Sequence, residues 1–274
     1  MKPHLIAVDL DGTLLSDEKT ISVKNRSILF KLRQLGHHVV IATGRPYRAS
    51  ATYYQQLALN TPMVNFNGAF VHHPLSPKEF KTIHTPLDKK TAKTIIETCE
   101  TFRVKNMMVE VMDDYYLRYL NEGFAESFTM NQPPSSHWNI DQIIKKSPTS
   151  LLIQPNDNQH MELKDLLSHA HAEVIDQRSW GAPWHVIEII KSGLNKAIGL
   201  EKISNHLSIP QDRIVAFGDE DNDLEMLEYA GCGVAMGNAI GQLKTVANEE
   251  TSTNEEDGVA TFLENFFSIK ADTY

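Results

Sequence analysis

The sequence predicts an α/β fold: a doubly wound, mostly parallel sheet with an inserted α+β domain. Two observations predict the sheet. Short apolar runs typical of buried strands occur at residues 5–8, 38–42, 63–66, 213–217 and 231–235. Helical patterns lie between several of these runs, and strands that alternate with helices favour a parallel sheet covered on both faces.

Three helices of this core follow from apolar spacing and from end signals. The first fills the stretch between the strands at 5–8 and 38–42 and ends at Gly36. The second begins near Asn195, and the third follows Asp221. The polar stretch 248–258 is expected to be a loop before a final short helix.

The middle of the chain has a different character, which indicates an insertion. All three tryptophans (Trp138, Trp180 and Trp184) and the one Pro-Pro pair fall between Pro86 and Glu188. We therefore expect a core made of residues 1–83 and 188–274. An α+β cap domain of residues 84–187 would be joined to it through linkers near Pro86 and near Pro183.

The composition narrows the class of protein. With 41% hydrophobic and 22% charged residues, the 274-residue chain is typical of a globular protein. A net charge of −9 argues against nucleic acid or an anionic membrane as the main partner. Two cysteines make no disulfide framework, and no signal peptide precedes the first strand, so a cytoplasmic location is expected.

Four segments carry the chemistry. They are Asp9-x-Asp11-Gly12-Thr13, Thr43-Gly44-Arg45, Lys196, and Gly218-Asp219-x-x-Asn222-Asp223. Three of them directly follow predicted strands. Because the carboxyl ends of parallel strands meet at one edge of a sheet, these segments are expected to converge there.

Charge then predicts a metal and a substrate. Asp9, Asp11, Asp219 and Asp223 would crowd together, and a like-charge pair near 4 Å costs about 4 kcal/mol at an effective dielectric of about 20. A cation is therefore expected, and oxygen donors favour Mg²⁺ over zinc. Since Mg²⁺ prefers phosphate oxygens, the substrate is expected to be a phosphate. Thr43, Gly44 and Lys196 could bind its oxygens.

Together these segments resemble the motifs of the haloacid dehalogenase (HAD) superfamily. The similarity is closest to its Cof-type phosphatases, whose inserted cap, of subclass IIB, lies between the second and third motifs. It spans nearly the whole chain, and further matching segments are Asn67-Gly68-Ala69, Gly237-Asn238-Ala239 and Asp257-Gly258-Val259-Ala260. The resemblance implies a HAD-like Rossmannoid core and a Mg²⁺-dependent phosphatase.

The resemblance also implies roles. Asp9 would be the nucleophile that forms an aspartyl-phosphate, and Asp11 would protonate the leaving alcohol and later activate water. Mg²⁺ would be held by Asp9, by the backbone carbonyl of Asp11 and by Asp219, with Asp223 supporting the site. Phosphate and substrate contacts are implied for Thr43, Gly44, Arg45, Lys196, Asn222 and Asn67.

Several alternatives stay open. Arg45 could be a surface ion-pair partner, Asn222 a helix cap, and Asn67-Gly68 a hairpin turn. Asp219-x-Asp221-x-Asp223 begins like a calcium loop, but Leu224 stands where that loop needs glycine. Cap aromatics such as Tyr115 are expected in the cap core, with one or two stacking on a planar leaving group as the alternative.

The function also has rivals. A phosphoacceptor signalling module uses similar residues, but Asp11 favours turnover over a stored phosphoryl group. A dehalogenase needs no leaving-group acid, and a phosphomutase is a further alternative. The expected partner is a small phosphorylated metabolite: a sugar phosphate, pyridoxal phosphate, flavin mononucleotide or a ribitylaminopyrimidine phosphate. The chain is expected to be a monomer or a weak homo-oligomer.

Overall fold

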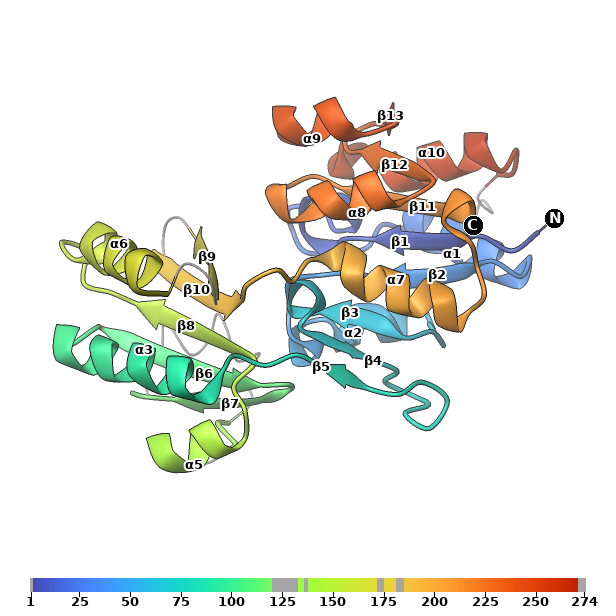
Figure 1. Cartoon of the computed structure of the whole chain (residues 1–274). Helices are drawn as coiled ribbons and strands as arrows, with labels where there is room; N and C mark the ends of the chain where they lie inside the picture. Colours follow the sequence, from blue (N-terminus) through green and yellow to red (C-terminus); the bar gives the residue numbers. More distant parts are fainter. Residues whose placement is uncertain (1, 120–132, 136–137, 172–174, 181–184, 271–274) are drawn as a thin grey trace. The chain divides into compact units, whose positions relative to one another are not determined.

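The computed structural model describes residues 2–119, 133–135, 138–171, 175–180 and 185–270, with the backbone alone for 176–180. The chain forms two compact units (Figure 1). The first comprises Met1–Arg45, Ser50–Ile83 and Asn195–Tyr274, and the second comprises Pro46–Ala49 and His84–Leu194. Within the described part of the chain, no helix is long and apolar enough to cross a lipid bilayer.

The first unit is built on a five-stranded sheet in the order β13-β12-β11-β1-β2, and all neighbouring strands in it pair in parallel. Four of its strands occupy apolar runs that the sequence marked. The strands are β1 (Leu5–Val8), β2 (His38–Ile41), β11 (Ile214–Gly218), β12 (Cys232–Ala235) and β13 (Glu249–Glu250).

The strands of this sheet end together at one edge. Val8 lies opposite Ile41 on one side and opposite Phe217 on the other. The residues that directly follow Val8 and Phe217 therefore lie at the same edge of the sheet. This register places the polar segments that follow the strands within reach of one another.

Helices cover both faces of the sheet (Figure 1). On one face α7, α8 and α9 bury Leu200, Met226 and Leu243 against Leu5 and Ile214. On the other, α1 packs on α10, whose Phe262 meets Phe217. The helices are α1 (Val23–Gln34), α2 (Ala51–Gln56), α7 (Lys196–His206), α8 (Leu224–Tyr229), α9 (Gly241–Val246) and α10 (Gly258–Phe266). The predicted doubly wound α/β fold is confirmed.

Two details of the first unit differ from the expectation. The run at 63–66 does not become a regular strand of the parallel sheet: β3 (Met63–Asn65) pairs antiparallel with β4 (Phe70–His72) and meets the sheet through one bridge, Ala42 to Val64. The polar stretch 248–258 is not only a loop. It contains β13 and a short 3₁₀ turn before α10, because a sheet edge can take a polar strand that faces water.

The second unit is an antiparallel sheet with helices on one face. The strand order is β7-β6-β8-β10-β9, and all neighbouring strands pair antiparallel. The strands are β6 (Asn106–Val111), β7 (Asp114–Leu117), β8 (Ser150–Gln154), β9 (Ile175–Trp180) and β10 (Val186–Lys191). β5 (Ile83–His84) lies where the chain passes from one unit to the other.

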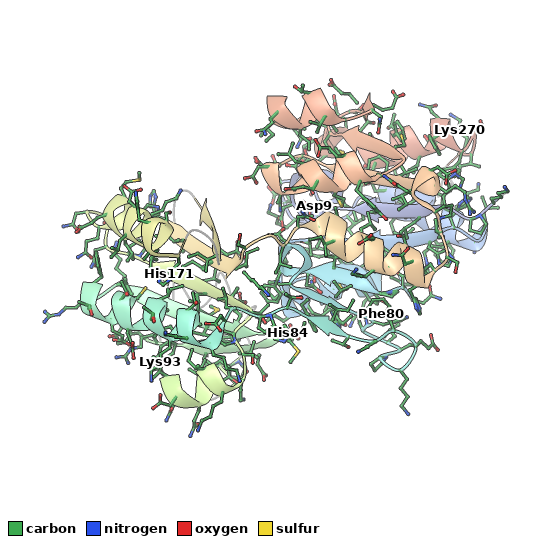
Figure 2. All side chains as sticks on the ribbon, in the orientation of Figure 1. Asp9, Phe80, His84, Lys93, His171 and Lys270 are labelled. Atoms are coloured by element: carbon green, nitrogen blue, oxygen red, sulfur yellow. The ribbon has the colours of Figure 1, made fainter. Side chains whose placement is uncertain are left out.

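The core of the second unit lies on the helical face of this sheet. Ile95 of α3, Ile143 of α5 and Leu163 of α6 pack against alternate residues of the strands, such as Val109 and Ile153. The helices are α3 (Lys89–Phe102), α5 (Ile140–Lys145) and α6 (His160–His171). Figure 2 labels Lys93 on α3 and His171 at the end of α6.

The unit boundaries differ from the expected 84–187 at one end. The second unit runs on to Leu194 because β10, which spans residue 187, pairs with both β8 and β9. Four residues of the first half of the chain, 46–49, also belong to it. The expected linker at Pro183 lies outside the described residues.

The aromatic residues of the second unit divide between two environments. Tyr116 is buried in the core, with Trp138 packed against that core. Tyr115 is buried on the opposite face of the sheet, and Tyr119 is half exposed. Trp184 and the side chain of Trp180 lie outside the described residues.

Candidate active site

The site lies at the carboxyl ends of the two central strands of the first unit. Asp9, which is labelled in Figure 2, directly follows β1. Asp219 directly follows β11, the neighbour of β1 in the sheet. From β1 the chain goes on to β2 on one side, whereas from β11 it goes on to β12 on the other. Such a reversal of strand order is where open α/β sheets bind ligands.

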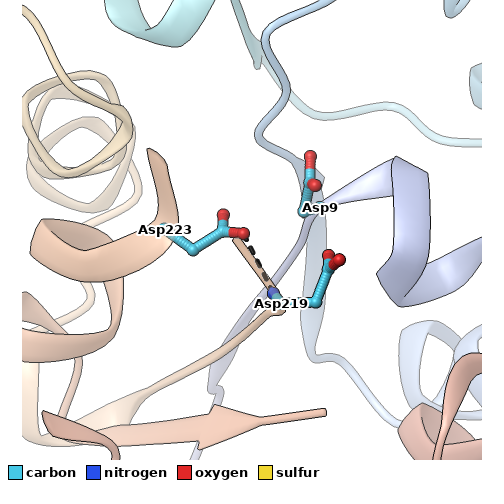
Figure 3. A group of neighbouring side chains, drawn as sticks. All are labelled: Asp9, Asp219 and Asp223. Carbon is cyan, nitrogen blue, oxygen red and sulfur yellow. Dashed lines mark hydrogen bonds between the residues drawn. The ribbon is translucent and has the colours of Figure 1, made fainter. Parts of the chain in front are cut away.

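Three carboxylates meet at this point (Figure 3). Asp9, Asp219 and Asp223, which we term the aspartate triad, each offer a carboxylate oxygen within 4.8 Å of the others. All three are buried, and Asp223 is completely so. The backbone N–H of Asp219 donates to Asp223 Oδ2 at 3.0 Å, so the turn after β11 fixes two members of the triad together.

Lys196 reaches the same point from the face of the sheet that α7 covers. Its ammonium lies 2.9 Å from Asp9 Oδ1 and donates to Asp223 Oδ1 at 2.7 Å, and its side chain is fully buried. It is the first residue of α7, which begins there because the Asn195 side chain accepts a hydrogen bond from the backbone N–H of Ile198. The helix start therefore holds the cation in place.

The charges of the triad are not balanced by this lysine. Burial raises the pKa of Asp9 to about 7, against the attraction of Lys196 and with added repulsion from Asp223. Burial and repulsion from Asp9 also raise the pKa of Asp219 to about 7. The pKa of Lys196 is raised, because attraction to Asp223 and Asp9 outweighs its burial. The surplus negative charge and the all-oxygen donor set fit a divalent cation.

The turn after β1 is shaped to admit Asp219. Gly12 has a φ of +70°, and a side chain at this position would overlap the Asp219 carboxylate. Thr13 Oγ1 donates to Asp219 Oδ1 at 2.7 Å, and Asn238 Nδ2 donates to the carbonyl of Gly12 at 2.7 Å. The sequence reasoning gave Thr13 and Asn238 no role. Their membership of matching motifs was the only signal that could have found them.

Asp11 points to a different set of partners. Arg45 donates to its carboxylate twice, Nε to Oδ2 and Nη2 to Oδ1, both at 2.6 Å, and Lys19 Nζ donates to Oδ1 at 2.9 Å. Partial burial acts to raise the pKa of Asp11, but Arg45 and then Lys19 outweigh it and lower the pKa to about 2. The Asp11 side chain thus stands apart from the triad as an ionised carboxylate. Nothing in the sequence marks Lys19.

The remaining predicted residues gather around the loop after β2. Thr43 Oγ1 accepts a hydrogen bond from the backbone N–H of Arg45 at 3.2 Å. Asn222 Nδ2 donates to Asn67 Oδ1 at 3.0 Å, and a side chain at Gly44 would come within 3.2 Å of the Asn67 amide. Asn222 is not the cap of its helical turn, since Glu220 is. Asn67 does form a turn, between β3 and β4, and its side chain is buried.

This fold and these residues define a class of enzyme. The sequence profile of the haloacid dehalogenase-like hydrolases matches residues 6–263, and the chain belongs to this family. It is a phosphatase of the family, as its relatives are. The predictions of the family and of a phosphoric monoester hydrolase are therefore confirmed.

Three relatives define the similarity further. The chain is 52% identical to the 5-amino-6-(5-phospho-D-ribitylamino)uracil phosphatase YitU of Bacillus subtilis, over 98% of this chain and 99% of that protein. It is 29% identical to the pyridoxal phosphate phosphatase YbhA of Escherichia coli, over 96% and 98%. A crystal structure of a Thermotoga maritima protein superposes with a TM-score of 0.84 at 29% identity, covering 96% of this chain and 97% of that one. The chain is thus similar to phosphatases of small phosphorylated metabolites.

Proposed function

We propose that this enzyme hydrolyses 5-amino-6-(5-phospho-D-ribitylamino)uracil, in a Mg²⁺-dependent reaction that passes through a phosphoryl group on Asp9. The identity of 52% over almost the full length of both chains supports this substrate class. The observation that carries the chemistry is the Asp9 carboxylate, which lies at the end of β1 beside the Lys196 ammonium and two further carboxylates.

Asp9 is the best-placed nucleophile of the triad. Asp223 Oδ1 is bonded to Lys196, and its Oδ2 accepts the backbone N–H groups of Asp219 and Glu220. Asp219 Oδ1 accepts the Thr13 hydroxyl. Asp9 has an oxygen oriented by Lys196, and a carboxylate that attacks phosphorus splits one hydrolysis into two easier steps.

Asp9 and Asp219 would hold Mg²⁺, with Asp223 fixing the lysine and the turn that place them. When bound, the ion supplies charge stabilisation to the phosphoryl oxygens. Lys196 adds a point charge at the same place, and its two bonds to Asp9 and Asp223 orient it before substrate arrives.

Asp11 is the acid and base of the proposed reaction. As an ionised carboxylate bound by Arg45 and Lys19 it is ready to accept a proton from water, but to donate one it must be released from these cations. A dianionic phosphate ester offers Arg45 a competing partner with suitable geometry for its two-pronged donor group. We propose that Arg45 moves from Asp11 to the substrate when the phosphate binds.

The second unit would select the leaving group. Its sheet carries apolar and polar side chains on the face away from its helices, including Met108, Tyr115 and Leu152. An aromatic ring such as Tyr115 could stack on a planar uracil, although here it lies under Arg48.

A direct test is to measure phosphate release by the purified enzyme from this compound, pyridoxal phosphate, flavin mononucleotide and hexose phosphates. We expect the highest kcat/KM for the ribitylaminouracil phosphate, loss of activity in EDTA and recovery with Mg²⁺. Mass spectrometry after acid quenching during turnover should find phosphate on the peptide that contains Asp9. Full activity in EDTA, or a modified residue elsewhere, would refute the mechanism, and preference for another ester would refute the substrate.

A further inference from the structure

Lys19, whose ammonium is bonded to Asp11, has an unfavourable backbone conformation. Its φ is +57°, in the left-handed region that costs free energy for a residue with a Cβ atom. Residues 17–19 form the loop of a hairpin, which is closed where the backbone N–H of Ser16 donates to the Thr20 carbonyl at 3.0 Å. A three-residue hairpin loop places its last residue in the left-handed region, and glycine is favoured there. Local backbone preference therefore does not explain a lysine at this position.

Stability does not explain the lysine either. The ion pair of Lys19 with Asp11 is 2.9 Å long, but the two side chains are 54% and 43% exposed. An exposed pair of this kind contributes little to the free energy of unfolding, because water screens the charges and both side chains lose freedom. Residues that persist in an unfavourable conformation are concentrated at functional sites. The lysine is therefore a candidate for a role in the reaction.

The backbone of Lys19 is held in place by contacts within the first unit. The Tyr53 hydroxyl of α2 donates to the Lys19 carbonyl at 3.0 Å. At the base of the hairpin, Asn254 Nδ2 donates to the Leu15 carbonyl at 3.0 Å. All of these residues, like Asp11, belong to the first unit. The position of the ammonium on Asp11 is therefore set within one unit.

The two oxygens of Asp11 have different partners. Oδ2 accepts a hydrogen bond from Arg45 Nε, whereas Oδ1 accepts from Arg45 Nη2 and also from Lys19 Nζ. If Arg45 moves to the substrate phosphate, as proposed above, Oδ2 is released and Lys19 still holds Oδ1. Donation requires the release of only that oxygen which carries the proton. Lys19 can therefore stay bound and keep the carboxylate oriented.

We propose that Lys19 is a positioning residue for the proton-transfer step, which holds Asp11 by Oδ1 so that Oδ2 carries the proton. In that step Asp9 bonds to phosphorus, the bond from phosphorus to the ester oxygen breaks, and this oxygen takes the proton from Oδ2. The inference rests on the acid–base role proposed for Asp11. It assigns Lys19 no contact with the substrate and no part in the aspartate triad.

The decisive variant is Lys19→Gly, because it removes the ammonium and relieves the backbone in one change. With alkyl phosphates we expect kcat to fall roughly tenfold, a part of the 10²–10⁴-fold contribution of acid–base catalysis. With p-nitrophenyl phosphate, whose leaving group needs no proton, the fall should be less than about twofold. KM should change little for either ester. The Tm should equal or exceed that of the wild type, since glycine adopts a positive φ readily. Steady-state kinetics and thermal unfolding measure these quantities.

Two further substitutions of the same residue separate charge from backbone. Lys19→Met keeps the left-handed backbone and most of the side chain but loses the ammonium, so it should show the same selective loss with alkyl phosphates. Lys19→Arg keeps a cation and should restore part of the activity with these esters.

Matched controls exist in the first unit for the backbone and for the charge. Ser208 is exposed and has a φ of +55°, so Ser208→Gly should also keep or raise the Tm, with no change in leaving-group dependence. Lys24 forms an ion pair with Glu264, 3.6 Å long, and Lys24→Met should likewise leave the dependence unchanged.

An Asp11→Asn background makes the test specific. If Lys19 acts through Asp11, Lys19→Gly should add nothing to the leaving-group dependence of Asp11→Asn, since residues in one network are not additive. A further steepening in this background would mean that Lys19 acts on the leaving group by another route, which would overturn the proposal.

The outcomes also separate this inference from the proposed function. If Asp11→Asn itself leaves the leaving-group dependence as in the wild type, the acid role is wrong and the proposed mechanism fails with it. If Asp11→Asn steepens the dependence but Lys19→Gly has wild-type kinetics, or lowers kcat equally for all esters, the positioning role alone is overturned. A rise of KM by the same factor for all esters would show that Lys19 binds the phosphate instead.

Discussion

Each of the two units contains a buried cluster of charged side chains, and the two clusters differ in their balance of positive and negative charge. In the first unit, Lys196 faces the aspartate triad, so three carboxylates share its charge. In the second, the Arg48 guanidinium pairs with Glu110, which also accepts the Ser150 hydroxyl. Both lysine and arginine are buried, so burial alone does not distinguish the two clusters.

The difference in balance indicates what each cluster is for. Where the carboxylates carry more negative charge than the lysine can balance, the pKa values of Asp9 and Asp219 rise to about 7. The fold then holds repelling carboxylates whose repulsion a bound ligand can relieve. Where a cation is paired with a carboxylate that also accepts a hydroxyl hydrogen bond, the pair fixes the chain. The first arrangement suits ligand binding and catalysis, and the second suits holding a chain segment in place.

The largest effect is expected from a substitution that disrupts the charged cluster of the first unit. Asp9→Asn should lower kcat by about 10⁴-fold or more, as loss of a nucleophile does in other hydrolases. Because the change removes one of the crowded charges, stability should be kept or increased. The measurement is phosphate release together with thermal unfolding. The exposed Asp221→Asn, two residues from Asp219, is the control and should keep wild-type activity; retained turnover in Asp9→Asn would contradict the covalent route.

The next largest effect is expected from a substitution that tests whether Lys196 contributes to both stability and catalysis. Lys196→Met should lower kcat by about 10²–10³-fold, since a preorganised charge at the phosphoryl group is lost. It should also leave Asp9 and Asp223 without their cation, which costs about 3–5 kcal/mol when one partner of a buried pair is removed. Denaturant unfolding and steady-state kinetics measure the two losses. An activity loss without any stability loss would mean that the pair is not buried as described.

A pair of glycine variants compares the two units directly. Gly12 and Gly193 both have positive φ, of +70° and +75°, but only at Gly12 would a side chain meet another group, the Asp219 carboxylate. Gly193→Ala should cost about 1–2 kcal/mol from backbone strain alone. Gly12→Ala should cost more and should also weaken Mg²⁺ activation, read from the Mg²⁺ concentration at half-maximal activity. Equal stability losses and unchanged activation would show that the turn does not shape the metal site.

The last expected effect concerns the dependence of stability on pH and on the metal. Raising the pKa of Asp9 and Asp219 from 3.8 to about 7 means that the folded, metal-free protein binds protons more tightly than the unfolded chain. These groups therefore oppose folding increasingly as pH rises from about 4 to about 7. Mg²⁺ at 100 times its Kd should stabilise by about 2.7 kcal/mol, a Tm rise of several degrees at pH 8.

At pH 5 the same Mg²⁺ concentration should raise Tm little, because protons already neutralise the triad. Calorimetric scans in EDTA and in Mg²⁺ at both pH values measure the difference, and Asp219→Asn should abolish the rise at pH 8. An equal rise at both pH values would argue that the ion binds elsewhere.

Much of the first unit could be predicted because its signals are local. A buried parallel strand is a short apolar run, and four such runs became neighbouring strands of one sheet. Asp9 and Asp219 could be expected to meet for the same reason, since both follow such strands. The end of the inserted segment could not be placed, because β10 belongs to the second unit through its pairing with β8 and β9, and no signal within its own residues assigns it there.

By itself, the sequence determined the class of fold. It also predicted the edge of the sheet that carries the site, with four aspartates and Lys196 gathered there. Only the tertiary structure decided that Asp11 turns to Arg45 and Lys19 and that Arg48 is held in the other unit. The physical reason is the distance along the chain over which each signal acts. Periodicity and motif spacing record what a residue does within its own element, whereas the partner of a long charged side chain is fixed only when distant segments pack together and exclude water.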